Sequence, residues 1–131
     1  MKVYLAAAWS RRLEIKEIAE QLTALGVEIT SRWLDEEVGM ELKCSEHFLR
    51  DRAYVDLADV DAADAIVRFT DRVTSDTVSK NLISGARMVE FGYAKARGKT
   101  LYVVGGKQNV FDNLDGIVHL KDVNELVAVL S

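Results

Sequence analysis

Apolar and polar residues follow two alternating patterns along the chain. Short apolar runs typical of buried strands are separated by segments whose apolar residues recur every three or four positions, as on one face of a helix. The runs lie at residues 3–8, 27–29, 65–69, 101–104 and 117–120. Strands that alternate with helices form parallel sheets, because right-handed crossovers place the helices on both faces. We therefore predict a three-layer α/β fold of the flavodoxin or Rossmann-like type, with five parallel strands in the order 2-1-3-4-5.

The helical segments have recognisable starts and stops. Ser10 is a candidate cap for a helix that Gly26 ends, and Ser84-Gly85 and Gly98 delimit a later one. Asp122 and Glu125 have capping-box spacing for a last helix. Three segments are less defined. Residues 46–63 form one helix or two that separate near Tyr54–Asp56, Ser31–Ser45 is an insertion or a lid, and 70–81 is a polar loop at a strand's carboxyl end.

Composition narrows the class of protein. The 131 residues, 49% of them hydrophobic, predict a single domain over residues 1–131. A net charge of -4 argues against binding of a nucleic acid polymer. The chain has no apolar run near ~18 residues, and its start leads directly into a strand. A cytoplasmic protein without membrane contact is therefore expected.

Few residues are suited to metal or redox chemistry. Cys44 is the only cysteine, so an intrachain disulfide and a cysteine metal cluster are excluded and a nucleophilic role is weakly indicated. His47 and His119 are isolated and are interpreted as structural. The first strand lacks the glycines of a dinucleotide or P-loop motif. No cofactor and no metal are expected.

Glu90 is the most informative single residue. Its neighbours Met88, Val89, Phe91 and Tyr93 leave little polar face around it. The alternative is an ordinary solvated helix residue. Helical side chains lean toward the N-terminus, so the carboxylate can reach the carboxyl edge of the sheet, where folds of this class bind ligands at the reversal of strand order. A functional carboxylate is therefore one of two readings that remain open.

Other candidates surround the same edge. Four acids precede the third strand, and at least two of them are expected to be caps or solvated side chains. They are Asp56, Asp59, Asp61 and Asp64. A second carboxylate near Glu90 would give the pair that glycosyl chemistry needs, and metal binding is the less favoured use.

The segment after the first strand carries polar and aromatic candidates. Ser10, Arg11 and Arg12 stand at a helix N-terminus, where they form either an anion site or a cap with two surface arginines. Trp9 and Trp33 stack on a base or pack in the interior. The residues alone do not choose between these readings.

These residues together are familiar. The chain resembles the nucleoside 2-deoxyribosyltransferase superfamily, which also contains hydrolases of nucleoside 5′-monophosphates. The likeness covers nearly the whole length except a divergent middle around Val38–Leu49. Three islands carry it: Val3–Trp9, a strand with a Tyr and small residues; Asp56, eight residues before Asp64; and Gly85, Glu90, Gly92 and Ala94 in the family's nucleophile pattern.

The resemblance implies a role for each matched residue. Glu90 would attack the anomeric carbon of a nucleoside and hold a covalent glycosyl intermediate for water or a second base. Asp56 would handle the proton on the leaving base, and Tyr4 would hold Glu90 in position. Asn109 looks like the family residue that a neighbouring subunit contributes to the sugar, so a homodimer or higher homo-oligomer is implied.

One departure concerns the substrate. The transferases carry Asp six residues before the nucleophile, whereas this chain has Ser84, as the monophosphate hydrolases do. A hydroxyl tolerates a phosphate that a carboxylate repels. Ser84 and Gly85 with Ser10 and Arg11 or Arg12 are therefore expected to bind the phosphate of a nucleotide. A transferase acting on free nucleosides and a module that binds nucleotides without cleaving them are the alternatives.

Overall fold

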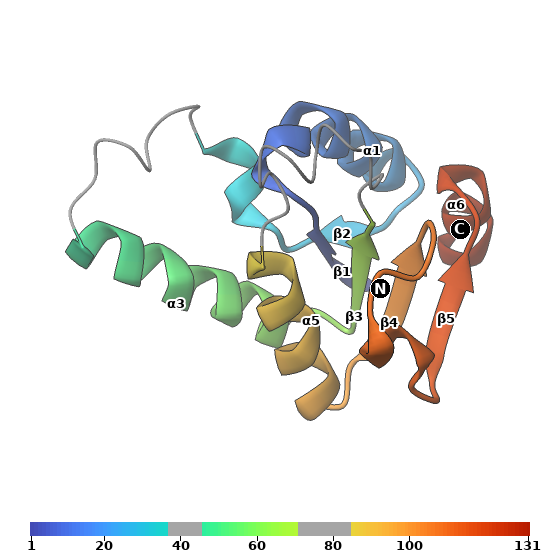
Figure 1. Cartoon of the computed structure of the whole chain (residues 1–131). Helices are drawn as coiled ribbons and strands as arrows, with labels where there is room; N and C mark the ends of the chain where they lie inside the picture. The colour runs from blue at the N-terminus through green and yellow to red at the C-terminus, as the bar shows by residue number, and fades with distance from the viewer. Residues whose placement is uncertain (37–45, 71–84) are drawn as a thin grey trace.

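The computed structural model describes residues 1–36, 46–70 and 85–131. Its centre is a five-stranded, all-parallel sheet in the order β2-β1-β3-β4-β5 (Figure 1). The strands are β1 (Lys2–Ala6), β2 (Glu28–Ile29), β3 (Ala65–Phe69), β4 (Thr100–Val104) and β5 (Ile117–Leu120). The strand order and the α/β class predicted from the sequence are confirmed.

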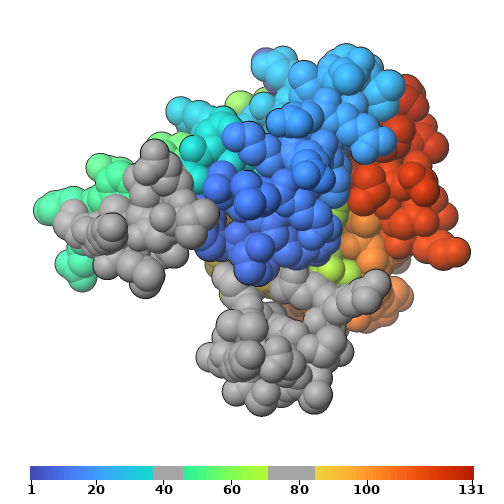
Figure 2. All heavy atoms as spheres, turned by 90° about the horizontal axis from the view of Figure 1, so that it is seen from above, coloured from blue at the N-terminus to red at the C-terminus, as the bar shows by residue number. Residues whose placement is uncertain are grey.

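Helices cover both faces of the sheet. They are α1 (Arg12–Ala24), α3 (Glu46–Ala62), α5 (Ala86–Ala96) and α6 (Val123–Leu130), with the short 3-10 helices η1 (Trp9–Arg11), η2 (Arg32–Asp35) and η3 (Val110–Asn113). Helices α3 and α5 pack against each other on one face, and α1 and α6 meet on the other (Figure 1). Seen from above, α3 and the C-terminal residues lie on opposite sides of the molecule (Figure 2). No helix in the described ranges is long and apolar enough to cross a bilayer.

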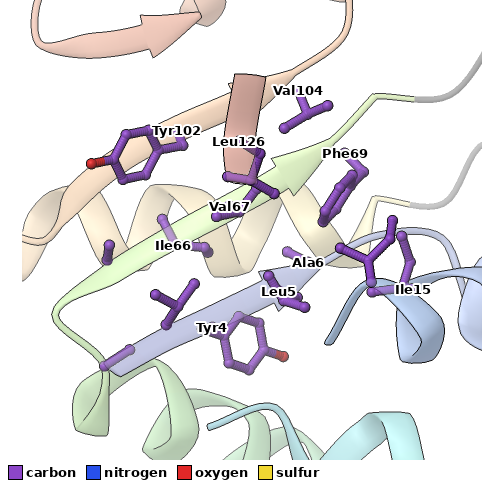
Figure 3. Packing of buried hydrophobic residues seen from close by; sticks show 14 of the residues in the cluster. Tyr4, Leu5, Ala6, Ile15, Ile66, Val67, Phe69, Tyr102, Val104 and Leu126 are labelled. Atoms are coloured by element: carbon purple, nitrogen blue, oxygen red, sulfur yellow. The ribbon is translucent and has the colours of Figure 1, made fainter. Parts of the chain in front are cut away.

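The core lies along the two central strands. Tyr4 on β1 pairs in register with Ile66 on β3, and Leu5 pairs with Val67. All four side chains are fully buried, and Figure 3 shows them side by side. Because residues of a strand alternate between the faces of a sheet, Tyr4 and Leu5 point to opposite layers. The sheet thereby directs the phenol of Tyr4 toward α3 and α5, which both contact β1.

Three sequence expectations are refined. Ser10 does not cap α1, because the chain first makes the 3-10 turn η1 and α1 begins at Arg12 with no side-chain cap. Residues 46–62 form one helix without a break. The aperiodic segment begins with η2, whose Trp33 and Leu34 are buried, so its first part is core; residues 37–45 lie outside the described residues. The polar loop is described only at Thr70.

A buried ion pair joins the centre of the sheet to η3. Arg68 on β3 donates to Asp112 over 2.7 Å, and both side chains are 1% exposed. The guanidinium of Arg68 also lies 4.7 Å from the ring centroid of Phe91 on α5. Asp112 in addition accepts the backbone N–H of Gln108, 2.7 Å away. The pair therefore fixes the loop after β4 to the sheet.

Candidate functional site

The centre of the candidate site is a contact between β1 and α5. The phenol of Tyr4 donates a hydrogen bond to the carboxylate of Glu90. Glu90 lies in the second turn of α5, which begins after Gly85, and a helical side chain there leans back toward the N-terminus of the helix. The resemblance predicted this contact from two residues that are 86 positions apart.

Burial sets the charge of Glu90. Removal from water raises its pKa, the Tyr4 hydrogen bond lowers it, and the charge of Asp56 raises it again, so that the pKa rises to about 7. The same surroundings raise the pKa of Tyr4 far above its ordinary value, first through burial and then through the charge of Glu90. Tyr4 is therefore a neutral donor at any physiological pH.

Asp56 is the second carboxyl of the site. It lies on α3, and burial together with the charge of Glu36 raises its pKa to about 6, although Arg52 opposes the shift. Among the residues that the structure describes, its Oδ1 atom is buried without a hydrogen-bond partner. Its charge acts on both Glu90 and Tyr4. Two carboxyls with raised pKa values thus flank one phenol, and perturbed carboxyls of this kind are typical of functional sites.

The other three acids of the cluster have structural partners, as expected for at least two of them. Asp59, Asp61 and Asp64 all accept hydrogen bonds from neighbouring elements. Their donors are Arg32, Tyr93 with Arg97, and the backbone of Lys2, respectively. Within the described ranges, Asp56 is the member of this cluster that has a buried carboxyl oxygen without a hydrogen-bond partner.

Arg11 and Arg12 are held by protein groups. Arg11 pairs with Glu14 and donates to the carbonyl of Thr70 over 3.0 Å, which ties η1 to the end of β3. Arg12 donates to the carbonyl of Leu34 over 2.8 Å and so braces η2. The segments after β1 and β3 do converge, as expected. An anion would have to compete with these contacts for either guanidinium.

Trp9 is half-buried and packs against protein. Its ring lies 6.3 Å from that of Trp33 and 5.4 Å from the guanidinium of Arg12. Trp33 donates its indole N–H to the carbonyl of Leu5. Trp33 is therefore a core residue, while contact of Trp9 with a base stays a prediction.

The remaining candidates are placed only in part. Gly85 is exposed at the N-terminus of α5, but Ser84 lies outside the described residues, as does Cys44. Asn109 is exposed, caps η3 and donates to the sulfur of Met88 at 3.6 Å, two residues from Glu90. Within the described ranges no group of three or more His, Cys, Asp and Glu side chains is arranged to hold a metal ion.

Sequence reasoning missed an ion pair beside Asp56. Arg52 on α3 pairs with Glu36, which follows η2. One signal was available: Arg52 stands four residues before Asp56, and that spacing places two side chains on the same helix face. The partner Glu36 had no such signal, because it comes from an aperiodic segment.

Two solved structures share this fold over nearly the whole chain. One is the CMP N-glycosidase of Clostridium botulinum, with a TM-score of 0.63 and 15% identity over 99% of this chain and 98% of that one. The other is a 2-deoxyribosyltransferase of the psychrotolerant bacterium Bacillus psychrosaccharolyticus, with a TM-score of 0.68 and 21% identity over 99% and 96%. No protein-family model and no curated protein matches the sequence. At these identities the likeness shows the fold, and the two neighbours are the kinds of protein that the sequence resembles.

Proposed function

We propose that the protein breaks the N-glycosidic bond of a nucleoside 5′-monophosphate, with water as the preferred acceptor. The observation that carries the proposal is the hydrogen bond from Tyr4 to a partly buried Glu90, whose pKa the charge of Asp56 also raises. A positioned carboxylate and a second carboxyl that can hold a proton are the two groups that glycosyl transfer requires. One neighbour is named for its action on CMP, which supports a monophosphate substrate.

The reaction proceeds in two displacements. An oxygen of Glu90 bonds to the anomeric carbon while the bond to the base breaks, and the bonding electrons leave with the base. Asp56 gives a proton to that base. Water then attacks the same carbon, the bond to Glu90 breaks, and the proton of the water passes to Asp56. The product of this second step is the free sugar phosphate. The oxocarbenium-like transition states of both steps are stabilised by the carboxylate.

Tyr4 positions the nucleophile. Its hydroxyl engages one oxygen of Glu90 and leaves the other for the sugar. Tyr4 is fully buried between the sheet and the helices, so its hydroxyl is held in place. The carboxylate of Glu90 that it binds therefore has little freedom to rotate. Holding the attacking atom in one place lowers the entropy cost of the first step.

The phosphate is proposed to lie at the N-terminus of α5. Ser84 and Gly85 precede that helix, and amide N–H groups at a helix N-terminus favour an anion. Ser10 is exposed on η1 and Arg11 contacts Thr70 at the end of β3, so both lie on segments that lead to this edge. Arg12 would join them only by leaving the carbonyl of Leu34.

Replacing Ser84 with Asp tests the phosphate. We expect kcat/KM for monophosphates to fall by at least about tenfold relative to the free nucleosides, because two negative charges would face each other. The measurement is the ratio of kcat/KM for a monophosphate to that for its nucleoside, so the nucleoside is an internal control. Improved activity of Ser84→Asp on monophosphates would contradict the proposal that the phosphate binds beside residue 84.

The pH profile tests the pair of carboxyls. Glu90 must be ionised and Asp56 protonated, so the pair must hold one proton. With pKa values of about 7 for Glu90 and about 6 for Asp56, kcat/KM is expected to be bell-shaped with its maximum between these values. Asp56→Asn should lower the maximum by about 10²- to 10⁴-fold. Activity that keeps rising to pH 9 in the unmodified protein would exclude Asp56 as the acid.

Transfer to a free base is the second candidate, because the other structural neighbour is a deoxyribosyltransferase. The two reactions share the first displacement and differ only in what attacks the glycosyl-Glu90 ester. Base exchange that requires a free acceptor base would establish transfer. Saturable nucleotide binding with no base released would establish a binding module instead.

A further inference from the structure

Arg52 and Glu36 extend the site along α3. Arg52 precedes Asp56 by one helical turn, about 6 Å along the helix axis, and both act on the protonation of Asp56. The side chains of Arg52 and Glu36 are 28% and 20% exposed, so their ion pair is mostly withdrawn from water. The pair therefore adjoins Asp56 on α3, and the charge of Asp56 acts in turn on Glu90.

Two buried side-chain atoms on this part of α3 have no hydrogen-bond partner among the described residues. In the ranges 1–36, 46–70 and 85–131, the Nε atom of Arg52 and the Oδ1 atom of Asp56 are buried without a hydrogen bond. A buried polar atom without a partner destabilises the protein, because it has lost its hydrogen bonds to water and gained none in return. One donor and one acceptor left open on the same helix face indicate a ligand that has complementary groups.

We propose that Arg52 and Glu36 read the edge of the leaving base, and that they select bases carrying both an amino group and a carbonyl oxygen, namely cytosine and guanine. The inference rests on the proposed function, because it places the sugar at Glu90. With the glycosidic nitrogen beside Asp56, the far edge of the base extends along α3 toward Arg52.

The chemistry of the two side chains gives the selectivity. In cytosine and in guanine, one ring nitrogen is flanked by a carbonyl oxygen and an amino group. Arg52 donates to the carbonyl oxygen, and Glu36 accepts from the amino group, as these side-chain types do with bases elsewhere. Uracil and hypoxanthine lack the amino group, and adenine lacks the carbonyl oxygen. A site that hydrogen-bonds both groups of the base disfavours a base that lacks either one, because one of its polar atoms is then left without a hydrogen bond.

Two substrate pairs test the selectivity in the unmodified protein. Cytidine 5′-monophosphate is compared with uridine 5′-monophosphate, and guanosine 5′-monophosphate with inosine 5′-monophosphate. Within each pair only one base has the amino group. We expect kcat/KM to be at least about tenfold higher for the amino member of at least one pair. Ratios near one in both pairs would overturn the inference.

Glu36→Gln tests the assignment to a residue. The amide of Gln accepts and donates, so the ratio within the favoured pair should narrow to within about threefold. Asp35→Asn is the matched control: it removes the same charge one residue earlier, where Asp35 pairs with Lys16 at the surface, and it should leave the ratio unchanged. If Glu36 had a purely structural role, Glu36→Gln would lower kcat/KM for all substrates by the same factor and leave the ratio unchanged. A ratio that Glu36→Gln does not change would overturn the inference.

Arg52→Lys provides a second variant with the charge kept. Lys lacks the fork of guanidinium donors, so the ratio should again narrow, whereas Arg50→Lys on the exposed part of α3 should not change it. The failures are distinguishable. Base release without discrimination overturns the reading of the base and leaves the proposed function standing, and no base release from any monophosphate overturns both.

Discussion

Glu90→Gln is expected to lower base release from nucleoside 5′-monophosphates by about 10⁴-fold or more, the scale seen when a nucleophile is removed. The amide has the same shape and still accepts the hydrogen bond from Tyr4, but it cannot displace the base. The measurement is chromatographic base release under single-turnover conditions. Glu17→Gln on the exposed side of α1 is the matched control and should keep full activity.

The same variant should be more stable at alkaline pH. The folded protein holds the proton of Glu90 up to about pH 7, whereas an unperturbed Glu releases it near 4.5. The folded state therefore binds more protons in this window, and its stability falls as the pH rises from 4.5 to 7. Gln avoids this loss, so its free energy of unfolding should exceed that of the parent by about 3 kcal/mol at pH 8 and by little at pH 4.

Urea unfolding at pH 4 and pH 8 checks this expectation. It also shows that lost activity is not lost folding, because the inactive variant must be the more stable protein at pH 8. Equal stability of the two proteins at both pH values would contradict the burial of an ionisable Glu90. Undiminished base release by Glu90→Gln would contradict its role as the nucleophile.

Asp112→Ala is expected to destabilise the fold by about 3–5 kcal/mol, the cost of leaving one charge of a buried pair alone. Arg68 then stays in the interior without its carboxylate. The backbone N–H of Gln108 also loses its acceptor. Burial alone would raise the pKa of Asp112, but hydrogen bonds from Gln108 and Arg68 outweigh it and hold the pKa below its usual range. The measurement is urea unfolding at pH 7.

Two further variants distinguish the loss of the Arg68–Asp112 ion pair from a general effect of changing the loop after β4. Asp115→Ala removes an exposed acid from the same loop and should change stability by less than about 0.5 kcal/mol. Arg68→Met combined with Asp112→Ala removes both charges and should recover part of the loss. If Asp112→Ala unfolds at the same urea concentration as Asp115→Ala, the pair contributes nothing to stability.

The sequence predicts the architecture well because buried parallel strands leave a strong local signal. Apolar runs such as 65–69 and 117–120 coincide with β3 and β5. The prediction that Ser10 caps α1 is wrong, because Ser10 has the residue type of a cap but lies within a 3-10 turn that precedes the helix. Residue type alone does not report which turn precedes a helix.

The site is predicted in part for a similar reason. Glu90 stands out as a carboxylate among apolar neighbours, and the resemblance supplies Tyr4 and Asp56. The ion pair of Arg52 with Glu36 joins residues 16 positions apart, across a segment without periodicity. Contacts of that kind depend on tertiary packing, which no local pattern encodes.

The central claim is that Glu90 becomes bonded to the sugar. The most direct measurement is the protein mass after rapid acid quenching during turnover of a nucleoside 5′-monophosphate, followed by peptide mapping. We predict a transient mass increase equal to one sugar phosphate, located on the peptide that contains Glu90 and absent in Glu90→Gln. Base release accompanied by an adduct on another residue, or continuing undiminished in Glu90→Gln with no adduct, would contradict the account.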